Sequence, residues 1–170
     1  MGVASGVLIG GMVATSMLFL REASERGAAQ WVADVLAEAS GKPTINIGCK
    51  RDKWGSVRCD INPQGGAVYG DACHLDFPDK TFSVAMLSHV LEHVEDPEQV
   101  LLEAHRIADE VIAIVPNAFN VNTWLSPEHR WVFVGGSLVE NQPALFATVI
   151  ATLGAAAIIG VAAKASQNRR

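Results

Sequence analysis

Three short β-like runs in the first half of the chain each lead into a glycine or an acidic residue. The runs are Thr44–Ile47, Val57–Cys59 and Val68–Tyr69, and they lead to Gly48, Asp60 and Asp71. Ligands of a parallel sheet bind outside the carboxyl ends of its strands. A glycine there lets the backbone approach a ligand closely, and the carboxylates could accept hydrogen bonds from ribose hydroxyls (Asp60) and an adenine amino group (Asp71). The pattern therefore predicts a nucleoside-type site.

The elements around these runs alternate between strands and helices. Phe82–Leu87 and Val111–Val115 are two further apolar runs, and between them Asp96-Pro97-Glu98-Gln99 predicts a helix start with an aspartate cap. Only about eight residues separate the first two strands, so any helix there must be very short. Alternating strands and helices predict an α/β domain with a mostly parallel sheet.

The segment 21–40 has the periodicity of an amphipathic helix, which Gly41 and Pro43 end. Its apolar residues recur three and four positions apart: Ala28, Trp31, Val32, Val35, Leu36 and Ala39.

Composition narrows the class of protein. The 170 residues carry a net charge of −5, no basic stripe and only 6% aromatic residues, which argues against nucleic acid as a partner. The three cysteines, Cys49, Cys59 and Cys73, have no metal-type spacing, and an odd number argues against a disulfide framework.

Five motifs, in order and at natural spacings, resemble class I S-adenosylmethionine-dependent methyltransferases of the small type-11 group. They are Ile45-Asn46-Ile47-Gly48-Cys49, Cys59-Asp60-Ile61-Asn62-Pro63, Gly70-Asp71-Ala72, Leu75-Asp76-Phe77-Pro78-Asp79 and Ser88-His89-Val90-Leu91-Glu92-His93. The resemblance covers about residues 43–133. It implies a Rossmann-like fold, with S-adenosyl-L-methionine as the cofactor.

The resemblance also implies roles for individual residues. Around the cofactor it places Asn46, Gly48 and Cys49 on the methionine and ribose side, Asp60 on the ribose hydroxyls, Ile61 against the adenine face, Asp71 and Ala72 at the adenine edge, and Ser88 and His89 beside the sulfonium. His89 and His129 are the candidate catalytic residues, because both could reach a methyl acceptor.

Two features depart from the family pattern. Lys50 stands where the family has a glycine, and an apolar stretch soon follows Trp131, so we expect the usual last two strands to be missing. The expected fold is thus a truncated, Rossmann-like sheet of about five strands, flanked by hydrophobic N- and C-terminal helices. The alternative to an active enzyme is a catalytically decayed binding or scaffold protein on the same fold.

His89-Val90-Leu91-Glu92-His93 also matches H-x-x-E-H, a zinc-peptidase pattern. On a helix the two histidines would share one face and could bind zinc. The sequence shows no helix to supply a further ligand, so we expect no metal.

Two uncharged segments flank the domain. Residues 2–20 would span roughly 28 Å as a helix, and residues 143–163 form a second candidate span. Gly2, Gly6, Gly10 and Ala14 could allow helix–helix pairing in a membrane. The basic tail 164–170 leaves open whether the second segment spans once or is re-entrant.

These observations divide the chain into an anchor helix (1–20), a methyltransferase-like domain (21–142), a membrane-associated helix (143–163) and the tail. Arg21 and Arg26 place the domain on the cytoplasmic side of a membrane. The expected function is methyl transfer to a small-molecule or lipid-like acceptor.

Overall fold

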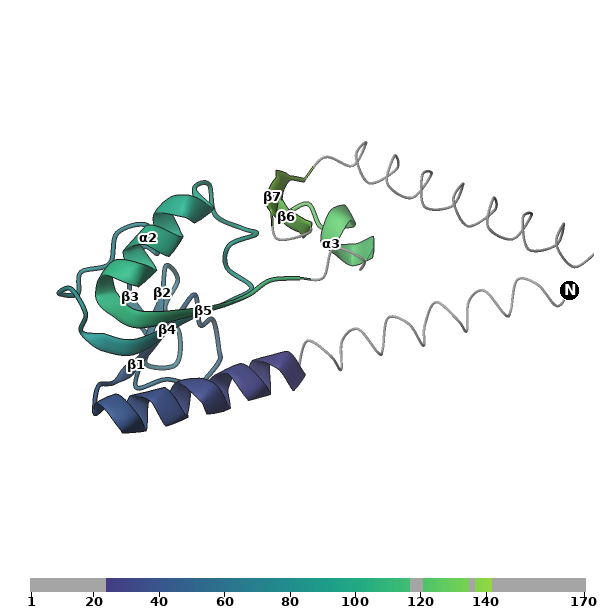
Figure 1. The fold of residues 1–170 in the computed structure, drawn as a ribbon. Coiled ribbons are helices and arrows are strands. Elements are labelled where there is room, and N and C mark those ends of the chain that lie inside the picture. Colours follow the sequence, from purple (N-terminus) through teal and green to yellow (C-terminus); the bar gives the residue numbers. More distant parts are fainter. Residues whose placement is uncertain (1–23, 117–120, 135–136, 142–170) are drawn as a thin grey trace, which may run out of the picture.

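A computed structural model describes residues 24–116, 121–134 and 137–141 of the chain. Its centre is a five-stranded parallel sheet in the order β3-β2-β1-β4-β5. The strands are β1 (Thr44–Ile47), β2 (Val57–Asp60), β3 (Val68–Tyr69), β4 (Phe82–Ser88) and β5 (Ala108–Ile114). Helix α2 (Pro97–Ile107) and the helix of residues 24–40 lie on opposite sides of this sheet (Figure 1). The Rossmann-like α/β fold with five strands is therefore confirmed.

The middle of the sheet is the most apolar part of the molecule. All four residues of β1 are buried, and so are the first six of β4, with which it pairs. Both strands are covered on two faces: β4 is a mostly apolar run, as expected for a strand inside a parallel sheet, whereas β1 also buries the polar Thr44 and Asn46. This buried pair fixes the strand ends that face the candidate site.

The connection from β1 to β2 contains no helix, as its length predicts. The helix of residues 24–40 holds this loop in place instead. Trp54 Nε1 donates to Asp34 Oδ1 at 3.0 Å, and Gln30 Nε2 donates to Asp52 Oδ2 at 3.3 Å. These two polar contacts therefore position the β1–β2 loop, which takes the place of the usual crossover helix.

The helix of residues 24–40 confirms the prediction of a helix, but its apolar stripe does not face the core. All six residues of the stripe are exposed, and Trp31 is 67% exposed. The helix instead turns Ala33, which is fully buried, toward the domain, with Ala29 and Ala37 partly buried beside it. Small side chains allow a close approach to the domain, and the larger apolar side chains remain outside.

Helix α2 begins as the sequence predicts. The Asp96 side chain accepts from the Gln99 backbone N–H at 2.9 Å, and Pro97 occupies the first turn. Its apolar face is turned to the core, with Val100, Ala104 and Ile107 fully buried. Strand β5 begins at Ala108, three residues earlier than predicted.

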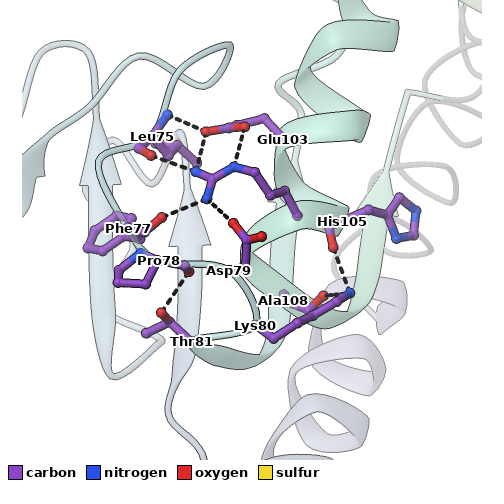
Figure 2. A network of polar contacts seen from close by, with 10 residues as sticks. Leu75, Phe77, Pro78, Asp79, Lys80, Thr81, Glu103, His105 and Ala108 are labelled. Atoms are coloured by element: carbon purple, nitrogen blue, oxygen red, sulfur yellow. Dashed lines mark hydrogen bonds and ion pairs between the residues drawn. The ribbon is translucent and has the colours of Figure 1, made fainter.

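A charged network ties the loop before β4 to α2 (Figure 2). Glu103 accepts the Leu75 backbone N–H at 2.7 Å and pairs with Arg106, which also donates to the carbonyls of Leu75 and Phe77. The hydrogen bond from Arg106 lowers the pKa of the Glu103 carboxyl. Burial acts in the opposite direction but is the smaller effect. The network explains the Leu75–Asp79 motif as a structural one.

Residues after β5 form a small unit outside the five-stranded sheet, which the sequence did not predict and which packs against the main core through Phe133. It contains α3 (Val121–Leu125) and a two-stranded antiparallel sheet of β6 (Trp131–Val134) and β7 (Ser137–Glu140). The Asn141 side chain donates to the carbonyls of Trp124 and His129, which joins the end of this hairpin to α3 and to the turn that follows it.

The predicted membrane segments, 2–20 and 143–163, lie outside the described residues, as does the basic tail. Within the described ranges, no helix combines the length and the apolar character needed to cross a bilayer.

Candidate cofactor site

The carboxyl ends of β1, β2 and β4 and the loop after β3 open onto one cavity of about 610 Å³. Six of the predicted cofactor residues line it: Gly48, Asp60, Ile61, Asp71, Ala72 and His89. This volume lies within the usual range for small-molecule sites. The strand-end reasoning therefore brought together residues that lie up to 41 positions apart in the sequence.

A second cavity of about 510 Å³ adjoins the first and shares Gly48 and Lys50 with it. The other predicted residues, Asn46, Cys49 and Ser88, line this smaller cavity. An elongated ligand with two chemically different ends could therefore extend across both cavities past Gly48.

Asp60 is buried at the end of β2 and its carboxylate is oriented by the backbone. Oδ2 accepts from the Lys50 N–H at 2.7 Å, and Oδ1 accepts from the Asn62 N–H at 2.8 Å. Each carboxylate oxygen has two lone pairs, so both retain capacity for a further donor. Such a fixed carboxylate suits a pair of neighbouring hydroxyl groups.

The loop after β1 is strained at the position where the sequence departs from the family pattern. Gly48 has φ +68°, and a Cβ there would lie 2.5 Å from a methyl carbon of Val90. Lys50 has φ +47°, in the left-handed region that favours glycine. The lysine thus adopts the backbone conformation that a glycine takes without strain.

Two buried polar atoms at the smaller cavity have no hydrogen-bond partner among the described residues, namely Ser88 Oγ and Arg26 Nε. Unpaired buried polar groups are uncommon in folded proteins. A zwitterionic amino-acid group would supply acceptors for both, with the Arg26 guanidinium opposite a carboxylate. This observation fits the methionine end of S-adenosylmethionine.

Sequence reasoning missed Arg26 and Gln30, which also line the smaller cavity. Both lie on the helix that precedes β1, on the side away from the exposed apolar stripe. The sequence did contain a signal for Arg26: it is a basic residue on the polar face of the helix that leads into the first strand.

Asp71 is exposed at the rim of the larger cavity. Its Oδ1 accepts from the Cys73 N–H at 2.9 Å, which orients the carboxylate. Ile61, 57% exposed, offers an apolar surface in the same cavity.

The cysteines near the site are neutral thiols. Burial raises the pKa of Cys49, and burial raises the pKa of Cys59 to about 11. Since the thiolate is the nucleophilic form, neither residue is suited to covalent catalysis at neutral pH.

The candidate catalytic histidines occupy different positions. His89, with φ +58°, follows β4 and lines the larger cavity. His129 does not line the cavity but lies next to His93, with ring centroids 4.9 Å apart. Residues 89–93 form a bend and a turn, so the shared helical face required by the zinc-peptidase interpretation is absent.

Fold and site together define an α/β domain with an elongated nucleoside-type cavity at the carboxyl ends of its parallel strands. Residues 48–110 match the family model described as a methyltransferase domain. The resemblance to class I S-adenosylmethionine-dependent methyltransferases is thereby confirmed, and the family indicates S-adenosylmethionine as the cofactor.

A curated relative is the demethylmenaquinone methyltransferase of Lysinibacillus sphaericus (strain C3-41), which is 31% identical over 84 residues. The match covers 48% of this chain and 36% of the relative, so the chain spans just over a third of that protein. A solved structure described as an S-adenosylmethionine-dependent methyltransferase, possible histamine N-methyltransferase, from Thermotoga maritima is 19% identical. It matches with a TM-score of 0.38 over 56% of this chain and 57% of that one.

Proposed function

We propose that this chain binds S-adenosylmethionine across the two adjoining cavities and transfers its methyl group to an acceptor. The observation that carries the proposal is that Gly48, Asp60 and Ser88, from the ends of three strands, line two cavities that share Gly48 and Lys50. The adenosine would lie in the larger cavity against Asp60 and Ile61. The methionine group would lie in the smaller one, with Arg26 opposite its carboxylate.

Methyl transfer makes few chemical demands on the protein. The acceptor's electron pair forms the new bond to carbon while the carbon–sulfur bond breaks and its electrons return to sulfur, which becomes neutral. The donor is already activated, so alignment of the two reactants is the main contribution of the site. An acceptor that must lose a proton needs a base, and His89 in the larger cavity is placed to accept one.

We further propose a lipid-like or small-molecule acceptor and a membrane location on the cytoplasmic side. The exposed apolar stripe of the helix 24–40 supports this, because that helix follows directly on the uncharged segment 2–20. The relative from Lysinibacillus sphaericus is named for demethylmenaquinone, so a quinone is one acceptor to test. Nucleic acid remains excluded from the proposal by the net charge of −5.

A second candidate function is a catalytically decayed methyltransferase fold that serves as a binding or scaffold protein. Lys50 is the observation that favours it, since the left-handed backbone at this position is strained for lysine. Both proposed functions use the same two cavities. Only the enzyme would transfer methyl groups repeatedly.

Calorimetric titration of the purified full chain with S-adenosylmethionine and its demethylated product tests cofactor binding. Asp60→Asn should weaken both ligands roughly 30-fold, about 2 kcal/mol, because it removes charge-assisted hydrogen bonds to the ribose. Asp76→Asn, at an exposed aspartate outside both cavities, is the matched control. Equal affinities in the two variants would remove Asp60 from the site.

Formation of the demethylated product with quinone and lipid acceptors then separates the two functions. An enzyme forms the product in step with acceptor methylation. Tight cofactor binding without product across the acceptor panel would favour the scaffold protein.

A further inference from the structure

We propose that Glu92, His93 and His129 form a binding site for one divalent transition-metal ion, of which zinc is the best match. Each residue offers one ligand atom, and the three atoms lie within 4.8 Å of one another. The H-x-x-E-H pattern paired His93 with His89, which is not part of this site, and supplied no ligand from another segment. The structure provides it as His129, from the turn that follows α3.

The hydrogen bonds of both histidines leave the correct nitrogen free. His93 Nδ1 lies 3.0 Å from the Glu128 carbonyl oxygen, and His129 Nδ1 lies 2.8 Å from the Thr123 carbonyl oxygen. A carbonyl can only accept, so Nδ1 is the donor in each ring, and in the neutral imidazole the lone pair is then on Nε2. Metal-bound histidines are held in this way, with the other ring nitrogen donating to a backbone carbonyl.

One oxygen of the Glu92 carboxylate is buried without a hydrogen-bond partner among the described residues. Glu92 is fully buried, and the oxygen concerned is Oε2. Its Oε1 is 3.1 Å from His89 Nδ1 and 3.9 Å from His93 Nε2. Buried carboxylates are ordinarily paired or bound to metal, and a cation beside Oε2 would satisfy this one.

The two segments that supply the ligands are held together by backbone contacts. The N–H groups of Arg130 and Trp131 both donate to the Glu92 carbonyl, at 2.7 and 3.3 Å. Trp131 Nε1 donates to the Val94 carbonyl at 3.0 Å, and Arg130 forms an ion pair with Glu95 at 3.0 Å. The site is therefore held by the fold, although its residues lie up to 37 positions apart in the sequence.

Two imidazole nitrogens and one carboxylate oxygen are a ligand set typical of zinc sites that keep an open coordination position. Bringing each ligand atom to a zinc–ligand distance of about 2.0–2.2 Å requires inward shifts of under about an ångström. His93 and the neighbouring Glu128 line the larger cavity, so an open position would lie beside it. If the proposed function holds, that position would take an oxygen, nitrogen or sulfur atom of the methyl acceptor.

Metal binding itself can be tested without any assumption about methyl transfer. The purified full chain is stripped with a chelator and titrated calorimetrically with Zn²⁺ alone. We expect about one equivalent to bind and to raise the melting temperature, because a metal that binds the folded state stabilises it. Co²⁺ in place of Zn²⁺ should give the intense visible absorption of a low-coordinate site.

Variants locate the ion. His129→Ala and Glu92→Gln should each weaken Zn²⁺ binding at least about 100-fold, since even loss of a ligand's supporting contact costs 10–100-fold. His129→Cys keeps a ligating atom and should retain binding, which distinguishes a lost ligand from a lost fold. His105→Ala, at an exposed histidine on α2, is the control and should bind as the parent does.

Two results would overturn the site. One is well under one equivalent of Zn²⁺ bound by the parent chain. The other is an affinity that His129→Ala and Glu92→Gln both leave unchanged, which would place the ion elsewhere. Both results leave the cofactor titrations untouched, so failure here is distinct from failure of the proposed function.

Discussion

Replacing Lys50 with glycine tests whether the loop after β1 carries strain. Lys50 adopts φ +47°, and its backbone N–H is fixed there by a 2.7 Å hydrogen bond to Asp60 Oδ2. The hydrogen bond involves only the backbone of residue 50, so the substitution retains it. The substitution removes the Cβ from a left-handed conformation and removes the ammonium group of a residue that lines both cavities.

The expected change in folding stability for Lys50→Gly follows from two opposing contributions. A left-handed conformation costs a residue with a Cβ roughly 1–2 kcal/mol, while glycine loses roughly 0.5–1 kcal/mol more entropy on folding. The net gain of Lys50→Gly is therefore about 0.7 kcal/mol, which raises the melting temperature of a chain of this size by about 2 °C. Lys50→Ala removes the same ammonium but keeps the Cβ, so its melting temperature should not rise.

The same pair of variants separates strain from charge in ligand binding. With the cofactor bound as proposed, the Lys50 ammonium would lie near the positively charged sulfonium, so both variants should favour S-adenosylmethionine relative to its neutral-sulfur product. Only Lys50→Gly should also relax the loop, and this should increase the affinity for both ligands equally. Scanning calorimetry gives the stabilities and isothermal titration gives the affinities.

Two outcomes would refute this reasoning. Equal melting temperatures for Lys50→Gly and Lys50→Ala would show that the left-handed backbone carries no appreciable strain. Equal weakening of both ligands in both variants would show that Lys50 pairs with the cofactor carboxylate. Lys50 would then be an adaptation of a working site, and its value as evidence for decay would be lost.

Three other predictions concern separate parts of the chain. Arg26→Gln should weaken S-adenosylmethionine about 10-fold in the same titration by removing a charge-assisted bond, whereas Lys53→Gln, an exposed cation outside both cavities, should not. The pKa of Glu103 is lowered in the folded state, so its stabilisation is complete above its ordinary value of 4.5 and is lost as the pH falls through the folded value. The melting-temperature gap between the parent and Glu103→Gln should accordingly narrow below that pH, and a constant gap would contradict the assignment. Deleting residues 1–20 and 143–170 together should release the domain from membranes, and carbonate-resistant pelleting of the trimmed protein would show another anchor.

The strands and α2 could be predicted because their signals are local. The short runs of β1 and β4 are buried along almost their whole length, and the cap Asp96 acts on a backbone group three residues away. The strand-end rule then placed Gly48 and Asp60 in one cavity, since parallel strands present their carboxyl ends at the same edge.

The remaining features depend on which surfaces meet, and periodicity carries no such information. The helix 24–40 has a clear apolar stripe, yet it docks through Ala33, because a small side chain allows closer approach to the loop held by Asp34 and Gln30. Likewise, His129 approaches Glu92 through backbone hydrogen bonds from Arg130 and Trp131, and no spacing in the sequence encodes those bonds.

The position of β5 at the end of the sheet has a consequence for how copies of this domain behave in concentrated solution. Within the described residues, no strand pairs with its outer edge, which leaves a row of backbone donors and acceptors available to another chain. Its charges, Asp109 and Glu110, stand near its start, while Val111–Ile114 carry none. Parallel pairing of two such edges would bring like charges together, whereas antiparallel pairing would set the charged start of one against the uncharged end of the other. Lys42 pairs with Asp109 at 2.6 Å, so Glu110 is the charge that most disfavours parallel stacking, and antiparallel self-association stays open.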